Sequence, residues 1–243
     1  MESELNVVKA ITNSVNDDSF LQGVRDCIPT LFGYISIGLA FGVVGIASHL
    51  NVLEIALLSI LVYAGAAQFI FCALILSGSP ASAIIITIFV VNLRHLLMSL
   101  SVAPYLTRYS VLRNIGFGTL LTDETFGVAM TKSMQADKLY ARWMDGLNIT
   151  AYSFWIASCI AGAFLGQWVA SPEKWGLDFA LIAMFIALLV LQLSNVGKGK
   201  VWHYLKLIGW MAVCMYTLSF LVPSYVAVLI ATVIVATIGV LTE

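Results

Sequence analysis

Three short stretches place polar side chains inside otherwise apolar sequence, where they could bind a charged ligand. They are YAGAAQF at residues 63–69, NLRH at residues 92–95 and LTDETF at residues 121–126. A polar or ionisable group at membrane depth has a high free-energy cost unless it is paired, faces a cavity or takes part in transport. Each stretch is therefore a candidate for substrate binding or proton transfer.

The stretch YAGAAQF is typical of a transmembrane helix that is interrupted near its middle. At such a break the freed backbone N–H and C=O groups face a cavity, and the N–H groups favour a carboxylate while the carbonyls favour an ammonium group. An amino acid carries both groups, so Gly65, Ala66 and Gln68 are predicted substrate-binding residues. The alternative is close helix packing, with Gln68 hydrogen-bonded across an interface.

The stretch NLRH puts an arginine within an apolar helix that Pro104 ends. An arginine at the bilayer centre costs at least about 2.5 kcal/mol unless it is solvated or paired. We predict that Asn92 and Arg94 bind substrate and that His95, which can titrate near neutral pH, relays a proton. The alternative is that Arg94 reaches the membrane surface along its flexible side chain.

The stretch LTDETF contains two adjacent carboxylates. Thr122 could cap the start of a helix, with Thr125 three residues on, which also fits an ordinary cytoplasmic helix start. If the segment is buried in the membrane instead, Asp123 or Glu124 becomes the predicted proton carrier and ion-pair partner of Arg94, because burial favours the neutral form of a carboxyl group.

The composition indicates which elements hold these stretches. Of 243 residues, 60% are hydrophobic and 10% are charged, against about 25% charged residues in an ordinary soluble domain. Uncharged runs of 27 residues between Asp26 and Glu54 and of 39 between Glu54 and Arg94 exceed the roughly 20 residues that cross a bilayer. We predict an all-α, polytopic integral membrane helix bundle of about six to eight membrane elements.

The domain organisation follows from the same pattern. Residues 1–26 are predicted to be a polar cytoplasmic segment without a cleavable signal peptide, and residues 27–243 a single transmembrane domain. Four tryptophans near span ends are expected to lie at the membrane surface, namely Trp143, Trp168, Trp175 and Trp202.

Two topologies satisfy the rule that short cytoplasmic loops are rich in Lys and Arg. In the first, residues 52–76 form a re-entrant hairpin broken at Gly65, which leaves ten of the twelve Lys and Arg residues inside. In the second, residues 52–76 cross fully and residues 115–132 dip into or cross the membrane, which leaves eight inside. Both topologies place the two termini in the cytoplasm, and the sequence leaves the choice open.

No pattern indicates an enzyme, a metal site or a cofactor. The chain lacks the GxSG, GxGD and HExxH patterns of intramembrane proteases and the GxxxxGK[ST] loop that binds nucleotide phosphates. The three histidines lie on separate segments without metal-ligand spacing, at His49, His95 and His203. The net charge of −1 excludes a basic nucleic-acid-binding face.

The three stretches, preceded by PTLFGYISIGLAFG at residues 29–42, resemble the AzlC family of branched-chain amino acid exporters, most densely over residues 25–145. The resemblance implies secondary export of valine, leucine, isoleucine and sometimes methionine across the inner membrane of a prokaryote, with a small hydrophobic AzlD-type partner subunit. Asn92 stands where the family often has an acidic residue. The alternative function is a membrane scaffold or permease subunit whose partner supplies the pathway or the energy.

Overall fold

The structure is a computed structural model that describes residues 19–136, 138–168, 186, 189–190, 193, 200–222 and 224–242. Within these ranges the chain forms helices joined by short turns, and no strand occurs among them. Three of the helices are long and apolar enough to cross a membrane. The all-α prediction is therefore confirmed for the described residues, whereas residues 1–18 and most of the predicted span between Asp178 and Lys198 lie outside them.

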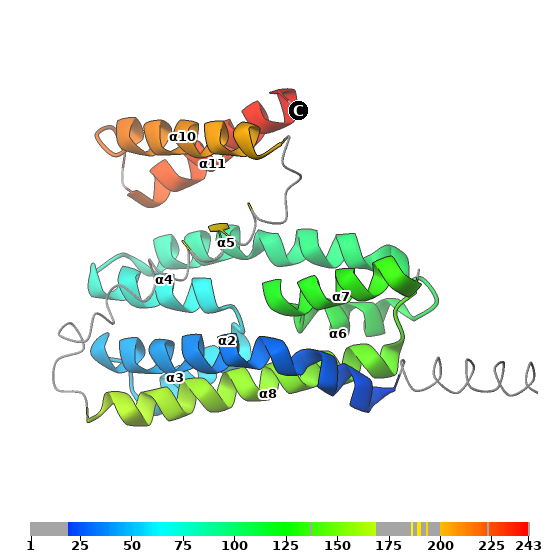
Figure 1. The fold of residues 1–243 in the computed structure, drawn as a ribbon. Helices are drawn as coiled ribbons and strands as arrows, with labels where there is room; N and C mark the ends of the chain where they lie inside the picture. Colours follow the sequence, from blue (N-terminus) through cyan, green and yellow to red (C-terminus); the bar gives the residue numbers. More distant parts are fainter. Residues whose placement is uncertain are drawn as a thin grey trace, which may run out of the picture.

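Two long helices, α2 (Phe20–Ala47) and α8 (Ala141–Gly166), form the most extensive helix pair of the described chain (Figure 1). Ser19 caps the start of α2 by accepting a hydrogen bond from the Gln22 backbone N–H at 3.1 Å. The helix therefore begins within the segment that was predicted to be polar and cytoplasmic, earlier than the first uncharged run.

The close approach of these two helices depends on glycine. Gly42 of α2 lies against the backbone of Cys159 and Ala163, and Gly23 lies against the backbone of Trp143. Because positions later in α2 meet positions later in α8, the two helices run in the same direction. Small residues at four-residue spacing allow such contacts between membrane helices.

The third long helix, α5 (Ala81–Val102), continues into a short 3-10 helix, η1 (Ala103–Leu106), and runs in the opposite direction to α2 and α8. The Leu139 N–H just before α8 donates to the Tyr105 carbonyl at 3.3 Å. The last turn of this helical segment therefore lies beside the first turn of α8, at the same end of the bundle.

Residues 52–76 form a helical hairpin, the first hairpin, made of α3 (Val52–Leu61) and α4 (Gly65–Leu76). Glu54 near the start of α3 and Ile75 near the end of α4 border one surface groove. The hairpin therefore returns to the end of the bundle from which it starts. The break lies at residues 62–64, directly before the predicted position at Gly65, and Tyr63 bends the chain there with a φ of 42°.

The second hairpin consists of α6 (Val111–Thr119) and α7 (Asp123–Ala136), and it approaches from the opposite end. Its start is held to α8 by an Arg113–Asp145 ion pair of 2.6 Å. Its far end leads into Leu139, which lies beside η1. Figure 1 shows the turns of the two hairpins facing each other near the middle of the bundle. The turns of the two hairpins therefore lie close together, far from both ends of the bundle.

The two ends of the bundle differ in charge. The end at the starts of α2 and α8, the basic end, holds Arg25, Arg108, Arg113, Lys132, Lys138 and Arg142. The opposite end, formed by residues 47–54, 76–82 and 163–168, contains no Lys or Arg.

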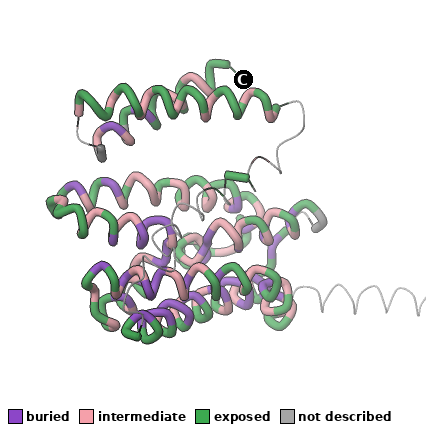
Figure 2. Tube along the Cα trace, turned by 60° about the vertical axis from the view of Figure 1, so that its left-hand side comes forward, coloured by how far each residue is buried: buried purple, intermediate pink, exposed green. Residues whose placement is uncertain are grey.

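The C-terminal helices α10 (Val201–Leu218) and α11 (Ser224–Thr242) pack mainly on each other. Figure 2 shows the buried residues concentrated between α2, α8 and the two hairpins, while the outer faces of α5 and α10 are exposed. Trp143 is fully buried, and its Nε1 donates to Asp26 at 2.8 Å. The prediction that Trp143 lies at the membrane surface is therefore wrong, because this indole fills the α2–α8 interface at the basic end.

Candidate functional site

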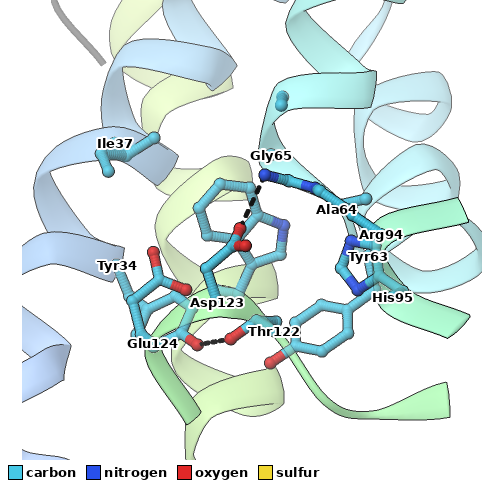
Figure 3. A pocket seen from close by; sticks show the side chains of 12 residues that line it. Tyr34, Ile37, Tyr63, Ala64, Gly65, Arg94, His95, Thr122, Asp123 and Glu124 are labelled. Carbon is cyan, nitrogen blue, oxygen red and sulfur yellow. Dashed lines mark hydrogen bonds and ion pairs between the residues drawn. The ribbon is translucent and has the colours of Figure 1, made fainter. Parts of the chain in front are cut away.

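The turns of the two hairpins meet at a small cavity, the central pocket. It encloses about 40 Å³ and is lined by Tyr34, Ile37, Tyr63, Ala64, Gly65, Ala66, Arg94, His95, Thr122, Asp123, Glu124 and Trp155. These residues come from both hairpin turns, from the middles of α2 and α8, and from α5 (Figure 3). A cavity of this size holds a little water, whereas one that binds benzene measures about 150 Å³. In this structure the pocket is therefore too small to hold an amino acid.

The start of α4 forms one wall of the central pocket. Its N-cap residue, Ala64, has no side-chain group with which to cap the helix. The first N–H groups of a helix have no partner within the helix and carry its positive dipole end. With Gly65 and Ala66 also lining the pocket, this wall favours a negatively charged group. Gly65 lies directly against the indole of Trp155, so a larger residue there would collide with the ring.

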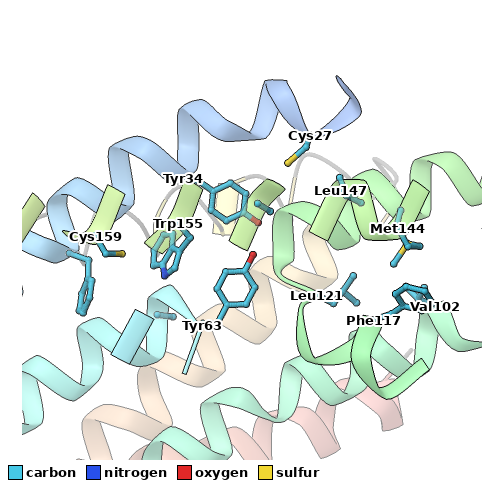
Figure 4. Close-up of a cluster of buried hydrophobic side chains, with 14 of the residues drawn as sticks. Cys27, Tyr34, Tyr63, Val102, Phe117, Leu121, Met144, Leu147, Trp155 and Cys159 are labelled. Atoms are coloured by element: carbon cyan, nitrogen blue, oxygen red, sulfur yellow. The ribbon is translucent and has the colours of Figure 1, made fainter. Parts of the chain in front are cut away.

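Tyr63, at the turn before α4, adds a polar atom to the pocket. The residue is 6% exposed, and its hydroxyl has no hydrogen-bond partner among the described residues. Figure 4 shows this hydroxyl pointing toward the hydroxyl of Tyr34. Tyr34 in turn shares a hydrogen bond with Thr122 in the second hairpin. A buried hydroxyl without a partner is uncommon in proteins, and this one belongs to a residue that lines the central pocket.

On the side of α5, Arg94 forms an ion pair with Asp123, the first residue of α7. Their Nη1 and Oδ2 atoms are 2.9 Å apart, and the two side chains are 29% and 25% exposed. The Nε atom of Arg94 is buried without a hydrogen-bond partner in the described chain. Arg94 therefore retains a donor beyond those used by Asp123.

His95 is oriented by the second hairpin. Its Nδ1 lies 2.9 Å from the Leu121 carbonyl oxygen, which can only accept a hydrogen bond. Nδ1 must therefore carry a proton, and in the neutral ring Nε2 is then a proton acceptor. This Nε2 is buried and has no partner among the described residues. Nε2 of His95 is thus a hydrogen-bond acceptor that no described residue uses, and the residue lines the pocket.

Two threonines cap the start of α7. The Thr122 N–H donates to the Thr125 hydroxyl at 2.8 Å, and the Thr125 N–H donates to the Thr122 hydroxyl at 3.4 Å. This exchange resembles a capping box in which a threonine replaces the usual glutamate. The cap leaves the Asp123 carboxylate to pair with Arg94, and Glu124 makes no hydrogen bond or ion pair with a described residue.

Most of the residues predicted from the sequence meet at this pocket. Gly65 and Ala66 of the first hairpin, Arg94 and His95 of α5, and Asp123 and Glu124 of the second hairpin line it together.

Gln68 and Asn92 lie outside the pocket lining. Gln68 is fully buried, accepts from Trp155 Nε1 at 3.1 Å and donates to the Ser59 hydroxyl at 3.3 Å. It therefore holds Trp155 against the first hairpin, as the packing alternative expects. The Asn92 side-chain oxygen is buried and has no partner in the described chain.

Tyr34, Ile37 and Trp155 complete the pocket and were not among the residues predicted from the sequence. The available signal was a polar aromatic residue near the middle of a long apolar helix. Tyr34 and Trp155 each occupy such a position in α2 and α8.

The amino-acid sequence matches the family model described as AzlC protein over residues 29–169. It is 28% identical to the inner membrane protein YgaZ of Escherichia coli (strain K12) over 177 residues, 71% of this chain and 72% of that protein. It is 26% identical to the branched-chain amino acid transport protein AzlC of Bacillus subtilis (strain 168) over 213 residues, 83% of this chain and 79% of that protein. An uncharacterized membrane protein of Archaeoglobus fulgidus is 31% identical over 179 residues, 72% of this chain and 77% of that protein. No solved structure matches the chain significantly.

Proposed function

The chain belongs to the AzlC family, and from this premise we propose that it exports branched-chain amino acids across the cytoplasmic membrane of a prokaryote. The substrates would be valine, leucine and isoleucine, with methionine as a further candidate. The name of the Bacillus subtilis relative supports this substrate class. The protein acts in this proposal as a secondary transporter and not as an enzyme.

The observation that carries the proposal is the composition of the central pocket. The start of α4 at Gly65 and the guanidinium of Arg94 favour a carboxylate. Glu124 and Asp123 supply negative charge for an ammonium group, and the side chains of Ile37 and Trp155 offer apolar contacts. A hydrophobic amino acid has these three parts.

The pocket must enlarge to admit such a substrate, since it encloses about 40 Å³. The two hairpins are the natural moving parts, because each meets the pocket only at its turn and neither belongs to the extensive α2–α8 pair. Alternating access by movement of one helical group against another is common among transporters with interrupted helices.

The proposed membrane placement has α2, α5 and α8 crossing the bilayer and both hairpins re-entering it, one from each side. Three helices of sufficient length and hydropathy support the crossings. The basic end would face the cytoplasm according to the bias of Lys and Arg. Further spans near the C-terminus would bring the total to about six to eight elements with both termini in the cytoplasm.

Proton coupling is proposed through the ionisable groups of the pocket. Asp123 and Glu124 would carry the proton, and His95 would relay it at Nε2, the nitrogen that its bond to Leu121 leaves unprotonated in the neutral ring. Because these groups lie beside the substrate in this proposal, protonation of the pocket and binding of the substrate affect each other.

A small AzlD-type subunit is the proposed partner, which the family resemblance implies. Expression of this chain alone and with such a subunit, followed by measurement of export, separates a transporter from a scaffold. A chain that exports leucine only when the partner is present, and whose pocket variants then have no effect, would act as a scaffold.

The proposal is tested by the flux of labelled leucine from vesicles that contain the purified protein, with the partner subunit if it is required. Arg94→Gln should lower the flux at least about tenfold, because the substrate loses its cationic ligand. Arg113→Gln is the matched control, since Arg113 is also paired with an aspartate but lies at the basic end, outside the pocket. Equal leucine fluxes in Arg94→Gln and Arg113→Gln would refute the proposal that the central pocket binds the substrate.

A further inference from the structure

A second, larger cavity adjoins the central pocket. This cavity, the vestibule, is a hollow open to the surface; it has a volume of about 420 Å³ and is lined by Asp26, Glu124, Gly127, Val128, Thr131, Lys132 and Trp143. It lies between α7 and the first two turns of α2 and of α8, and therefore at the basic end. Its volume is about ten times that of the central pocket, so it has room for an amino acid without any movement.

Glu124 is the one residue that lines both cavities among those that the structure describes. It stands in the first turn of α7, and in Figure 3 its carboxylate points into the central pocket on the side of Ile37. Glu124 therefore stands at the boundary between the vestibule and the central pocket.

Glu124 also differs from the neighbouring carboxylates in having no partner among the described residues. Asp123 is paired with Arg94. Asp26 accepts from Trp143 Nε1 at 2.8 Å and from Gln22 Nε2 at 2.8 Å. A partly buried carboxylate without a bonding partner is costly, and a cationic ligand would compensate its charge.

We propose that substrate enters through the vestibule and that Glu124 binds its ammonium group at the entrance to the central pocket. The inference rests on the proposed function and adds a direction of loading, from the basic end, and a residue that selects for the amino group. The second polar feature of the pocket, the buried and unpartnered hydroxyl of Tyr63, lies at the other hairpin turn beside the start of α4. The ammonium and carboxylate ends of an amino acid therefore face groups from opposite hairpins.

Selection for the amino group is tested with two ligands of the same carbon skeleton. Leucine carries an ammonium group where 2-hydroxy-4-methylpentanoate carries a hydroxyl, and the two are otherwise identical. Each is measured as a competitor of labelled leucine for binding to the purified protein. The wild type should prefer leucine strongly, and Glu124→Gln should reduce that preference at least about tenfold because a charge-assisted contact is lost. Glu124→Asp, which keeps the charge, should retain most of the preference and shows that loss of folding is not the cause.

Glu54→Gln is the matched control for this measurement. Glu54 also lies in the first turn of a helix, where it completes a capping box with Asn51 that glutamine can maintain. It lies at the opposite end of the bundle and should keep the wild-type preference. An unchanged preference for leucine in Glu124→Gln would overturn the role of Glu124.

The route is tested by blocking the vestibule from one side. Thr131→Cys places a thiol on the exposed wall of the vestibule, and Lys138→Cys places one at the same end outside it. The background variant Cys214→Ser removes the one cysteine that is not fully buried. A bulky, membrane-impermeant thiol reagent applied to the cytoplasmic face should abolish leucine flux in Thr131→Cys and leave it unchanged in Lys138→Cys.

The outcomes separate the two proposals. Full labelling of Thr131→Cys from the cytoplasmic face with unchanged flux would overturn the vestibule as the route while leaving the transport function intact. Failure of the wild-type protein, with its partner, to bind or move leucine would overturn the proposed function itself.

Discussion

Arg94 of α5 and Asp123 of α7 form an ion pair of 2.9 Å at the point where the second hairpin turns, near the middle of the bundle. The two residues are 29 positions apart in the sequence but lie beside the same pocket as the break in the first hairpin. The ion pair therefore holds α5 and α7 together beside the pocket that these two charged side chains line.

The Arg94–Asp123 pair should be coupled in its effect on stability. Arg94→Gln or Asp123→Asn alone leaves one partly buried charge uncompensated, whereas the double variant removes both. We expect a coupling free energy of about 1–3 kcal/mol from thermal unfolding of the four proteins in detergent. The more exposed Arg113–Asp145 pair should give less than about 1 kcal/mol. Equal coupling free energies for the two pairs would show that the central pocket excludes water no better than the protein surface does.

Leucine efflux should depend on the proton gradient and on Asp123. An uncoupler should collapse the efflux of labelled leucine from cells, and Asp123→Asn should lower it at least about tenfold because a general proton-transfer group is lost. Asp145→Asn, which also removes the carboxylate of an arginine pair, should retain the flux. Undiminished efflux both with the uncoupler and in Asp123→Asn would rule out the coupling mechanism.

The two ends of α5 should be labelled from opposite sides of the membrane. Single cysteines at Ser79, before α5, and at Arg113, after it, lie at opposite ends of the bundle. With the basic end in the cytoplasm, an impermeant thiol reagent should reach Ser79→Cys from outside and Arg113→Cys from inside. The reverse pattern is expected if residues 52–76 cross the membrane fully.

The contact between α2 and α8 should not accept a methyl group at Gly42. A Cβ atom there would overlap the Cys159 carbonyl oxygen and the Ala163 backbone nitrogen. Gly42→Ala should therefore destabilise the protein by about 1–3 kcal/mol, as overpacking does. Gly33→Ala, where no atom lies within 4 Å, should be neutral or slightly stabilising because alanine favours a helix. Similar unfolding temperatures for the two variants would contradict the helix packing described.

The sequence predicted the parts of the site that depend on residue type. Polar groups within apolar runs identified the stretches around Gly65, Arg94 and Asp123, because burial of such groups is costly anywhere in a bilayer. Their meeting at one pocket could not be predicted, since it depends on where the two hairpins turn. Gln68 illustrates the difference, because the same buried amide suits either a ligand or Trp155, and only the fold places Trp155 beside it.

The topology was left open for a related reason. The count of Lys and Arg residues allowed two topologies. Either residues 52–76 form a re-entrant hairpin, or residues 52–76 cross the membrane fully and residues 115–132 dip into or cross it as well. In the structure both segments are hairpins that reach the central pocket and return. Tyr34 was missed because nothing in its local sequence indicates that it meets Thr122, which lies 88 residues further along the chain.

The central claim, that a hydrophobic amino acid binds between the two hairpin turns, is tested most directly with a photoreactive diazirine analogue of leucine. After irradiation of the protein with its partner subunit, the modified residues are located by mass spectrometry with and without excess leucine. Labelling that leucine suppresses should fall on residues of the central pocket, with Ile37, Tyr63 and Trp155 as the expected positions. Leucine-suppressible labelling confined to the apolar surface groove between α3 and α4, at Leu57, Leu61 or Phe71, would contradict it.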